Sequence, residues 1–236
     1  MTTAFYVRPN AIQGDLATLE ADEARHATTV LRMRAGDEAY LVDGIGTAYR
    51  GTITDIDAKR VTITLHTRLS NHLEPHQRVI LAFGLIKNRQ RLEWIIEKGT
   101  ELGVHTFQPL LTTRAERDRI RIDRLDAIAL AAMKQSGRCV LPTIAPPLEL
   151  AQLLDTYPGV EQWLLAHESA VEPFDVPPEP LRTLGVIIGP EGGFTPAEIE
   201  ALGRENIHPK RLGPTRLRAE TAAIAALSRL LATTLP

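Results

Sequence analysis

The spacing of apolar residues predicts β-strands in the first third of the chain. Over residues 1–70, short runs rich in Val, Ile, Thr and Tyr are separated by Gly or Asp, a pattern typical of strands joined by tight turns. The predicted strands are residues 39–44, 47–57 and 60–67. Asp43-Gly44 and residues 57–59 are the predicted hairpin connections.

One helix is predicted within this strand-rich segment. It covers Glu23–Met33, with Asp22 as its N-cap and Gly36 just beyond its end. The helix and the strands together predict a small β-barrel.

The polar, proline-containing stretch Ser70–Gln77 separates two different periodicities. We place the domain boundary within it, which gives domains at residues 1–72 and 73–236. The apolar strands predicted beyond it are residues 79–86, 105–111, 163–168 and 183–189. The predicted helices are Arg91–Leu102, stopped by Gly103, and Ile122–Ser136. Strands that alternate with helices indicate an α/β fold with a mostly parallel sheet covered on both faces.

Composition alone does not indicate a nucleic-acid partner, but a phosphate-bearing partner could use the uneven distribution of charge. The chain has 44% hydrophobic and 24% charged residues and a net charge of -2. Residues 78–138 carry twelve basic and seven acidic side chains, whereas residues 139–236 carry seven and twelve. Of the 27 basic residues 22 are Arg, which favours bidentate contacts to phosphate. A high-GC genome is an equally good explanation of the Arg content.

Several classes of protein are excluded or disfavoured. The single Cys139 rules out a disulfide framework and a Cys-rich metal site. His72 and His76 have helical spacing, but Pro75 lies between them and no third ligand is near, so we expect no metal. No apolar run approaches the ~18 residues that span a bilayer, and the N-terminal sequence lacks the apolar core of a signal peptide. We therefore expect a cytoplasmic protein with no membrane partner.

The sharpest local motif is GPEGGF at residues 189–194, directly after an apolar strand. Its glycines free the backbone to approach a ligand, and their N–H groups can point into one concavity. Thr195 to Glu198 then fit a helix capping box with proline at the first helical position. Open α/β sheets place ligands at this end of a strand, although a tight turn without a ligand is the alternative. Neither GxGxxG nor GxxxxGK[ST] occurs, which excludes the common nucleotide sites.

A second glycine-bearing loop, Leu212–Thr221, precedes an Ala-rich helix that we expect to end near Ala232. Arg218, Glu220 and Thr221 gather at the start of that helix, where unpaired N–H groups favour an anionic or polar ligand group. Taken alone, the cluster is also explained as a helix cap with a salt bridge.

The order of these motifs resembles the bacterial 16S ribosomal RNA uridine-N3 methyltransferases (RsmE) of the SPOUT superfamily. The blocks that carry the resemblance are GPEGGF, LGPTRLRAETA, KNRQRLEWIIEKGTELGV, Glu116-Arg117, Gln135–Arg138, and Val30-Leu31-Arg32 with Gly36-Asp37. They span essentially the whole chain. One departure is Arg216-Leu217, where the family often has Ile-Leu, and it affects local packing only.

The resemblance implies a fold, a cofactor and partners. The implied fold is an N-terminal PUA-like or OB-like RNA-binding β-barrel followed by a SPOUT α/β domain with a C-terminal trefoil knot. S-adenosylmethionine is the implied cofactor, and 16S ribosomal RNA or the assembled small subunit is the implied partner. A homodimer is also implied, and an apolar surface of the last helix is expected to pack in it: Ala222, Ala223, Ala226 and Leu230.

Site residues are carried over motif by motif. The expected cofactor-binding residues are Leu165, Ala166, His167, Gly189, Pro190, Glu191, Gly192, Gly193, Leu212, Gly213, Leu217, Arg218 and Thr221. The expected RNA-binding residues are Arg8, Arg32, Arg114, Arg117 and Arg138. Residues 114–124 are rich in Arg, with acidic residues between the arginines. This stretch suits either phosphate contact or a salt-bridged helix start.

The chemistry of uridine N3 suggests catalytic candidates. The imide nitrogen must be unpaired and at least partly deprotonated, and a guanidinium would stabilise the charge that develops on the uracil oxygens. Arg218 is the candidate for this role, and Glu191 or Glu220 could accept the proton or merely pair with an arginine. Alternatives are a SPOUT ribose 2′-O or guanosine-N1 methyltransferase and a non-catalytic rRNA-binding assembly factor. A nucleotide hydrolase is disfavoured by the missing phosphate loop.

Overall fold

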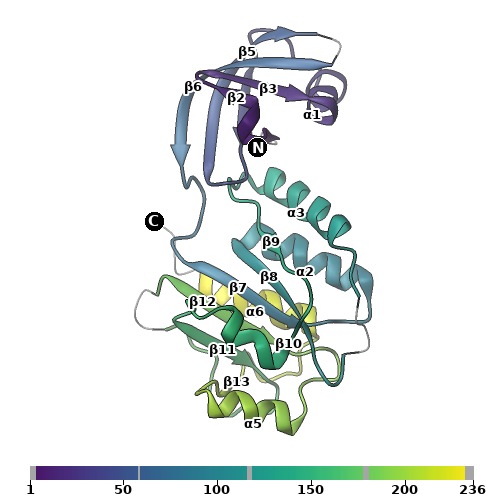
Figure 1. The fold of residues 1–236 in the computed structure, drawn as a ribbon, viewed down its shortest axis with the longest axis vertical. Coiled ribbons are helices and arrows are strands. Elements are labelled where there is room, and N and C mark those ends of the chain that lie inside the picture. The colour runs from purple at the N-terminus through teal and green to yellow at the C-terminus, as the bar shows by residue number, and fades with distance from the viewer. Residues whose placement is uncertain (1–3, 58, 116–118, 178–180, 232–236) are drawn as a thin grey trace. The chain divides into compact units, whose positions relative to one another are not determined.

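The computed structural model describes residues 4–57, 59–115, 119–177 and 181–231. Contacts divide the chain into two compact units (Figure 1). The first unit is Met1–Glu74 with Leu130–Leu141, and the second is Pro75–Ala129 with Pro142–Pro236. Because residues 130–141 group with the first unit, the division into residues 1–72 and 73–236 stays a prediction.

The first unit is built on a six-stranded sheet with the strand order β1-β4-β5-β6-β3-β2. Its strands are β1 (Phe5–Tyr6), β2 (Ile12–Gln13), β3 (Leu16–Glu20), β4 (Glu38–Val42), β5 (Thr47–Ile56) and β6 (Arg60–Ser70). The predicted hairpins β4-β5 and β5-β6 are confirmed, and both are antiparallel. In the first connection the buried carboxylate of Asp43 accepts hydrogen bonds from the backbone of Ile45 and Thr47. The three short strands β1 to β3 were not predicted.

The helix of the first unit differs from the prediction. It begins at Ala21 as α1 (Ala21–Arg25) and continues as one π-helical turn, His26–Val30. Asp22 therefore lies inside the helix and pairs with Arg25 at 2.8 Å, so its assignment as N-cap was wrong. The helix ends early because Arg32 takes a left-handed conformation, with φ of 55°.

The second unit contains a parallel sheet with the order β10-β8-β7-β12-β11-β13, and β9 pairs with β8. Its strands are β7 (Arg78–Gly84), β8 (Val104–Leu111), β9 (Thr143–Ile144), β10 (Leu148–Glu149), β11 (Gln162–Ala166), β12 (Thr183–Ile188) and β13 (Pro209–Lys210). All four predicted strands are present, and the predicted parallel arrangement is confirmed. The three two-residue strands were not predicted.

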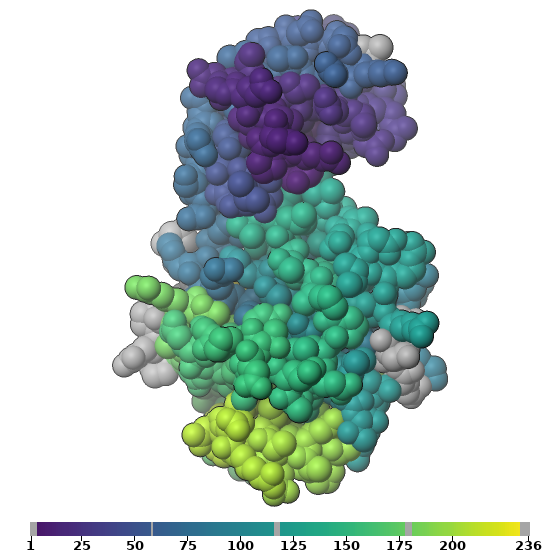
Figure 2. Space-filling model, in the orientation of Figure 1, coloured from purple at the N-terminus to yellow at the C-terminus, as the bar shows by residue number. Residues whose placement is uncertain are grey.

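Helices cover both faces of this sheet. The helices that follow β7 in the chain are α2 (Arg89–Leu102), α3 (Ile122–Ser136), α4 (Leu153–Thr156), α5 (Pro196–Arg204) and α6 (Ala219–Leu231), with a 3-10 turn at Leu150–Gln152. The part of α3 from Leu130 onward belongs to the first unit, as does the 3-10 turn Pro9–Ala11. The pair α2 and α6 packs together behind the sheet in Figure 1. On the other face, Leu153 of α4 and Leu202 of α5 share a core with Leu165 and Ile187 of the sheet. Figure 2 shows α5 at the surface, in yellow-green.

Local signals explain where the longer helices begin and end. Asn88 caps α2 by accepting from the backbone N–H groups of Gln90 and Arg91. Gly103 ends α2 in the left-handed conformation, with φ of 110°, as predicted. The predicted capping box of α5, Thr195 with Glu198, is also confirmed. In the part of the chain that the structure describes, no helix has both the length and the apolar character to cross a membrane.

Candidate functional site

The GPEGGF loop leaves the carboxyl end of β12 in the middle of the sheet and enters α5. Gly193 has φ of 68° and donates its N–H to the carbonyl of Pro190 at 2.9 Å, which closes a tight turn. The loop is seated against β7, because a Cβ at Gly84 would lie 2.4 Å from Cδ of Pro190. Only glycine at position 84 allows this approach without displacing the loop.

A cavity of about 320 Å³ lies beside this loop. Three segments line it: the end of β11, the GPEGGF loop and the connection from β13 into α6. The lining residues are Ala166, His167, Glu168, Ile188, Gly189, Pro190, Glu191, Gly193, Phe194, Arg211, Leu212, Gly213, Thr215, Arg216, Leu217, Arg218, Ala219 and Ala222. Its size is within the usual range for small-molecule sites.

Most of the residues expected to bind the cofactor line this cavity. They are Ala166, His167, Gly189, Pro190, Glu191, Gly193, Leu212, Gly213, Leu217 and Arg218. Three others do not. Leu165 is fully buried in the core of the sheet, Gly192 faces Arg114 on the outside of the loop, and Thr221 is exposed on α6.

The family resemblance implies three cofactor loops, Leu165–Glu168, Gly189–Gly193 and Leu212–Arg218, which also contain Glu168, Thr215 and Arg216 of the lining. The lining residues outside these loops were missed: Ile188, Phe194, Arg211, Ala219 and Ala222. Ile188 and Phe194 look like ordinary core residues in a sequence, and both are buried. The others adjoin predicted positions, so widening each glycine loop by one or two residues would have found most of them.

The polar rim of the cavity carries both signs of charge. Arg216 pairs with Glu168 at 2.7 Å across the β13–α6 and β11 segments. The Glu191 carboxylate accepts the backbone N–H of Lys87 at 3.3 Å, which links the loop to the start of α2. Arg218 is exposed and lines the cavity, and its backbone carbonyl accepts the N–H of Ala222 at 2.8 Å. Arg218 and Glu191 thus line the same cavity.

Glu220 lies next to this cavity but does not line it. Its Oε1 forms an ion pair with Nε of Arg91 of α2 at 3.3 Å, and the side chain is 12% exposed. Among the described residues its Oε2 is buried without a hydrogen-bond partner. A buried carboxylate oxygen without a partner is costly, and the ion pair with Arg91 offsets part of that cost.

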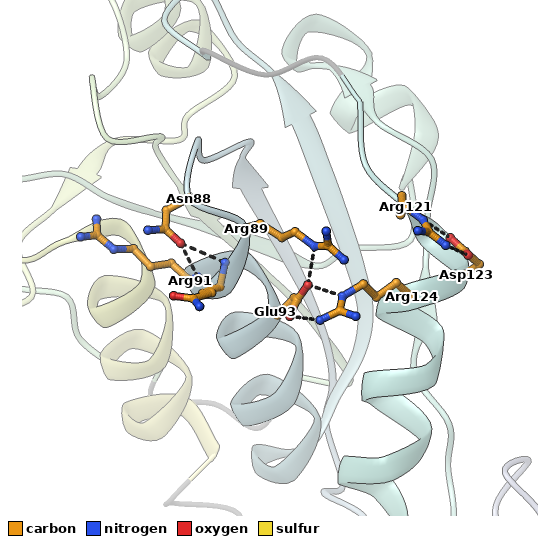
Figure 3. Close-up of polar contacts among 8 residues, drawn as sticks. Asn88, Arg89, Arg91, Glu93, Arg121, Asp123 and Arg124 are labelled. Carbon is orange, nitrogen blue, oxygen red and sulfur yellow. Dashed lines mark hydrogen bonds and ion pairs between the residues drawn. The ribbon is translucent and has the colours of Figure 1, made fainter.

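A basic surface joins the starts of α2 and α3. Figure 3 shows Arg89 and Arg124 pointing at Glu93, with the Arg121–Asp123 pair beside them. Glu93 accepts from both arginines, and Arg124 Nη2 is 2.8 Å from its Oε2. The hydrogen bond from Arg124 lowers the pKa of Glu93 to about 2. Partial burial acts in the opposite direction, and a second hydrogen bond from Arg89 lowers the pKa further. The carboxylate therefore stays ionised and holds the two guanidinium groups in place at any physiological pH.

The predicted RNA-binding arginines fall into different environments. Arg8 and Arg32 are exposed on the first unit. Arg114 is exposed on the second unit but donates to the GPEGGF loop. Arg117 lies outside the described residues. Arg138 is only 2% exposed and its guanidinium bonds to Glu74 at 2.7 Å, so it is placed as a buried ion pair rather than as a phosphate contact.

Replacing Arg138 with Ala is expected to destabilise the protein by ~3–5 kcal/mol, because it leaves a buried carboxylate without its counter-charge. Glu74 also accepts the backbone N–H groups of Cys139 and Val140 at 2.8 and 2.9 Å, so its charge is fixed in place. Chemical denaturation measures the loss. The double variant Arg138→Met with Glu74→Leu should recover part of it. A loss below ~1 kcal/mol would mean that the pair behaves as a surface salt bridge.

No cluster of three or more metal-ligating side chains is present among residues 4–57, 59–115, 119–177 and 181–231. Burial raises the pKa of the Cys139 thiol to about 12, so the thiol stays protonated and unreactive.

Comparison with known proteins identifies similar chains along nearly the whole length. A family model described as an RNA methyltransferase domain matches residues 73–231, and one described as an RNA methyltransferase PUA domain matches residues 19–65. Ribosomal RNA small subunit methyltransferase E of Bacillus subtilis (strain 168) is 30% identical over 227 residues, which cover 90% of this chain and 88% of that protein.

Two solved structures with bound S-adenosylmethionine are similar in fold. Ribosomal RNA small subunit methyltransferase E from Neisseria gonorrhoeae has a TM-score of 0.85 and 27% identity, over 97% of this chain and 96% of that one. A methyltransferase from Legionella pneumophila has a TM-score of 0.81 and 30% identity, over 99% of this chain and 98% of that one.

Proposed function

The chain belongs to the RNA methyltransferase family that includes ribosomal RNA small subunit methyltransferase E, and from this membership we propose its reaction and its site. The protein methylates N3 of a uridine in the 16S ribosomal RNA of the small subunit, with S-adenosylmethionine as methyl donor. The observation that carries the proposal is the cavity formed by three loops, two of them the family's glycine-bearing motifs.

The cavity fits the cofactor in size and in chemistry. Apolar side chains of Ile188, Leu212 and Leu217 line it together with the glycine-rich backbone of residues 189–193. This combination suits a ligand with a flat base and polar sugar and amino-acid ends. When bound, the cofactor supplies a methyl group on a positively charged sulfur, which a nitrogen nucleophile attacks.

The residues of the chain have three tasks in this reaction. The loops around the cavity hold and orient the reacting groups, and alignment alone supplies much of the rate increase of a two-substrate transfer. Arg218 stabilises the negative charge that develops on the uracil oxygens when N3 loses its proton. Glu191, which is exposed and lines the cavity, accepts that proton. Glu220, the second candidate from the sequence, does not line the cavity and pairs with Arg91, which suits it to a structural role.

RNA contacts come from exposed arginines. We assign Arg8 and Arg32 to phosphate contact, because both are exposed and guanidinium groups bind phosphate bidentately. Arg138 is left out of this assignment because it is buried. The test is transfer of labelled methyl from S-adenosylmethionine to small-subunit RNA, with large-subunit RNA as the control. Equal labelling of both would contradict the assigned substrate.

The finer features of the fold are also proposals. We propose that the first sheet closes into a PUA-like barrel and that the C-terminal chain threads a trefoil knot. In support of the knot, the chain runs from β13 at one edge of the sheet back to α6, which packs against α2 and the central strand β12. Reaction on ribosomal RNA further suggests that the protein acts in the cytoplasm.

We expect a symmetric homodimer in solution. The support is the family resemblance, since the surface predicted on α6 was wrong. Ala223, Ala226 and Leu230 are fully buried within the chain, and Ala222 lines the cavity. Light scattering at micromolar concentration should give twice the mass of the 26.0 kDa chain. A monomer at that concentration would contradict the dimer.

A further inference from the structure

The side chain of Arg114 contacts the outside of the GPEGGF loop. It follows β8, two strands from β12 in the sheet. Its Nη1 donates to the carbonyl of Gly192 at 2.9 Å and to the carbonyl of Phe194 at 3.3 Å. One guanidinium nitrogen thus bridges two carbonyls of the loop.

The backbone beside Arg114 is fastened to the same loop. The N–H of Thr113 donates to Oε1 of Glu198 at 2.8 Å, while Oε2 of Glu198 accepts the N–H of Thr195 at 2.7 Å. Burial alone would raise the pKa of Glu198, but these backbone donors hold it below its ordinary value. The carboxylate therefore stays charged and connects the end of β8 to the start of α5.

The loop has an inner and an outer side, and Arg114 is on the outer one. Gly189, Pro190, Glu191, Gly193 and Phe194 line the cavity. A Cβ built on Gly192 would meet Cβ of Arg114 at 3.1 Å, so at this point the two backbones approach closely. Arg114 itself does not line the cavity, and it can act on a ligand there only through the loop.

We propose that Arg114 is a positioning residue for the cofactor, and that it keeps residues 189–194 in the conformation that binds S-adenosylmethionine. The inference rests on the proposed function. A loop with three glycines loses much conformational freedom when it is ordered, and a group that orders it beforehand raises affinity without touching the ligand. Charge-assisted hydrogen bonds are the stronger kind. The rigid guanidinium fixes the directions of the two N–H bonds of Nη1, whereas the flexible side chain of Lys loses more conformational freedom to reach the same carbonyls.

The test compares Arg114→Ala and Arg114→Lys with Arg204→Ala. Arg204 is an exposed arginine of α5 that pairs only with Glu200 of the same helix among the described residues, so its variant controls for the loss of a guanidinium. Calorimetry with S-adenosylhomocysteine as probe should show affinity about tenfold weaker in Arg114→Ala, which corresponds to ~1.4 kcal/mol. The affinity of Arg114→Lys should lie between those of Arg114→Ala and the wild type, and the affinity of Arg204→Ala should equal that of the wild type.

A second measurement needs no cofactor. Hydrogen exchange of the unliganded protein should be faster at the amides of residues 191–194 in Arg114→Ala and unchanged in the strands β7 and β12, because the loss is confined to the loop. In steady-state kinetics the KM for the cofactor should rise while kcat at saturating substrates stays within about twofold, the pattern of lost binding rather than lost chemistry.

The outcomes separate this inference from the proposed function. Wild-type affinity together with wild-type exchange in Arg114→Ala would overturn the role of Arg114. A raised KM for RNA with unchanged cofactor affinity would overturn it too, in favour of the predicted phosphate contact. If the wild-type protein does not bind the probe, the proposed function fails, whereas the exchange measurement still reports on the loop.

Discussion

Replacing Arg218 with Ala is expected to lower the single-turnover rate of methylation by a factor of about 100 or more, as removal of a comparable electrostatic donor does in other enzymes. Arg218 is exposed and lines the cavity, and it is the last residue before α6. Among the residues that the structure describes, its guanidinium has no hydrogen-bond or ion-pair partner, so its removal should cost little stability. The measurement is the single-turnover rate at saturating cofactor and RNA, with the melting temperature determined in parallel.

A conservative variant sharpens this test. Arg218→Lys keeps the charge but not the planar pair of donors, so we expect little recovery of the rate. Arg204→Ala, on the exposed face of α5, should methylate at the wild-type rate. A variant of Arg218 that loses ~1 kcal/mol of stability but keeps the wild-type rate would show that the residue only caps α6.

Replacing Gly213 with Val should weaken cofactor binding by about 100-fold, which corresponds to the ~3 kcal/mol that overfilling a closely packed site can cost. Gly213 lines the cavity, and a Cβ built on it meets nothing within 4 Å, so the fold has room for the side chain. The added methyl groups would instead take space that the ligand needs. Calorimetry with S-adenosylhomocysteine measures the affinity, and thermal unfolding without ligand checks the fold.

Gly159 provides the matched control. It also has no atom within 4 Å of a built Cβ, but it does not line the cavity. Gly159→Val should therefore bind like the wild type. Equal affinities of Gly213→Val and the wild type would remove the β13–α6 connection from the cofactor site.

The sequence predicts those parts of the fold that depend on local signals. The apolar runs of β7 and β12 and the capping box at Thr195 specify structure through neighbouring residues alone, and the structure contains all of them. Strands such as β9 and β13 have two residues each and exist only because a longer strand pairs with them. No periodicity can appear over two residues, so these strands could not be predicted.

The site was predictable to the extent that glycine marks a loop. Glycine-bearing motifs placed two of the three segments that line the cavity, whereas Ile188 and Phe194 have the residue types of any core. The environment of Arg138 could not be predicted from its neighbours in the sequence. It follows Gly137, and only the fold brings it together with Glu74, 64 residues away, so that its charge is buried in an ion pair.

The most direct test of the central claim locates the methyl group. Small ribosomal subunits from a bacterial strain that lacks its own enzyme are incubated with the protein and labelled S-adenosylmethionine, and the RNA is digested to nucleosides for mass spectrometry. We expect the label in 3-methyluridine, in one 16S fragment, and none of it with the Arg218→Ala variant at matched early times. Label in a ribose 2′-O-methyl nucleoside or in 1-methylguanosine, or no transfer at all by a protein that binds the cofactor, would contradict the assigned reaction.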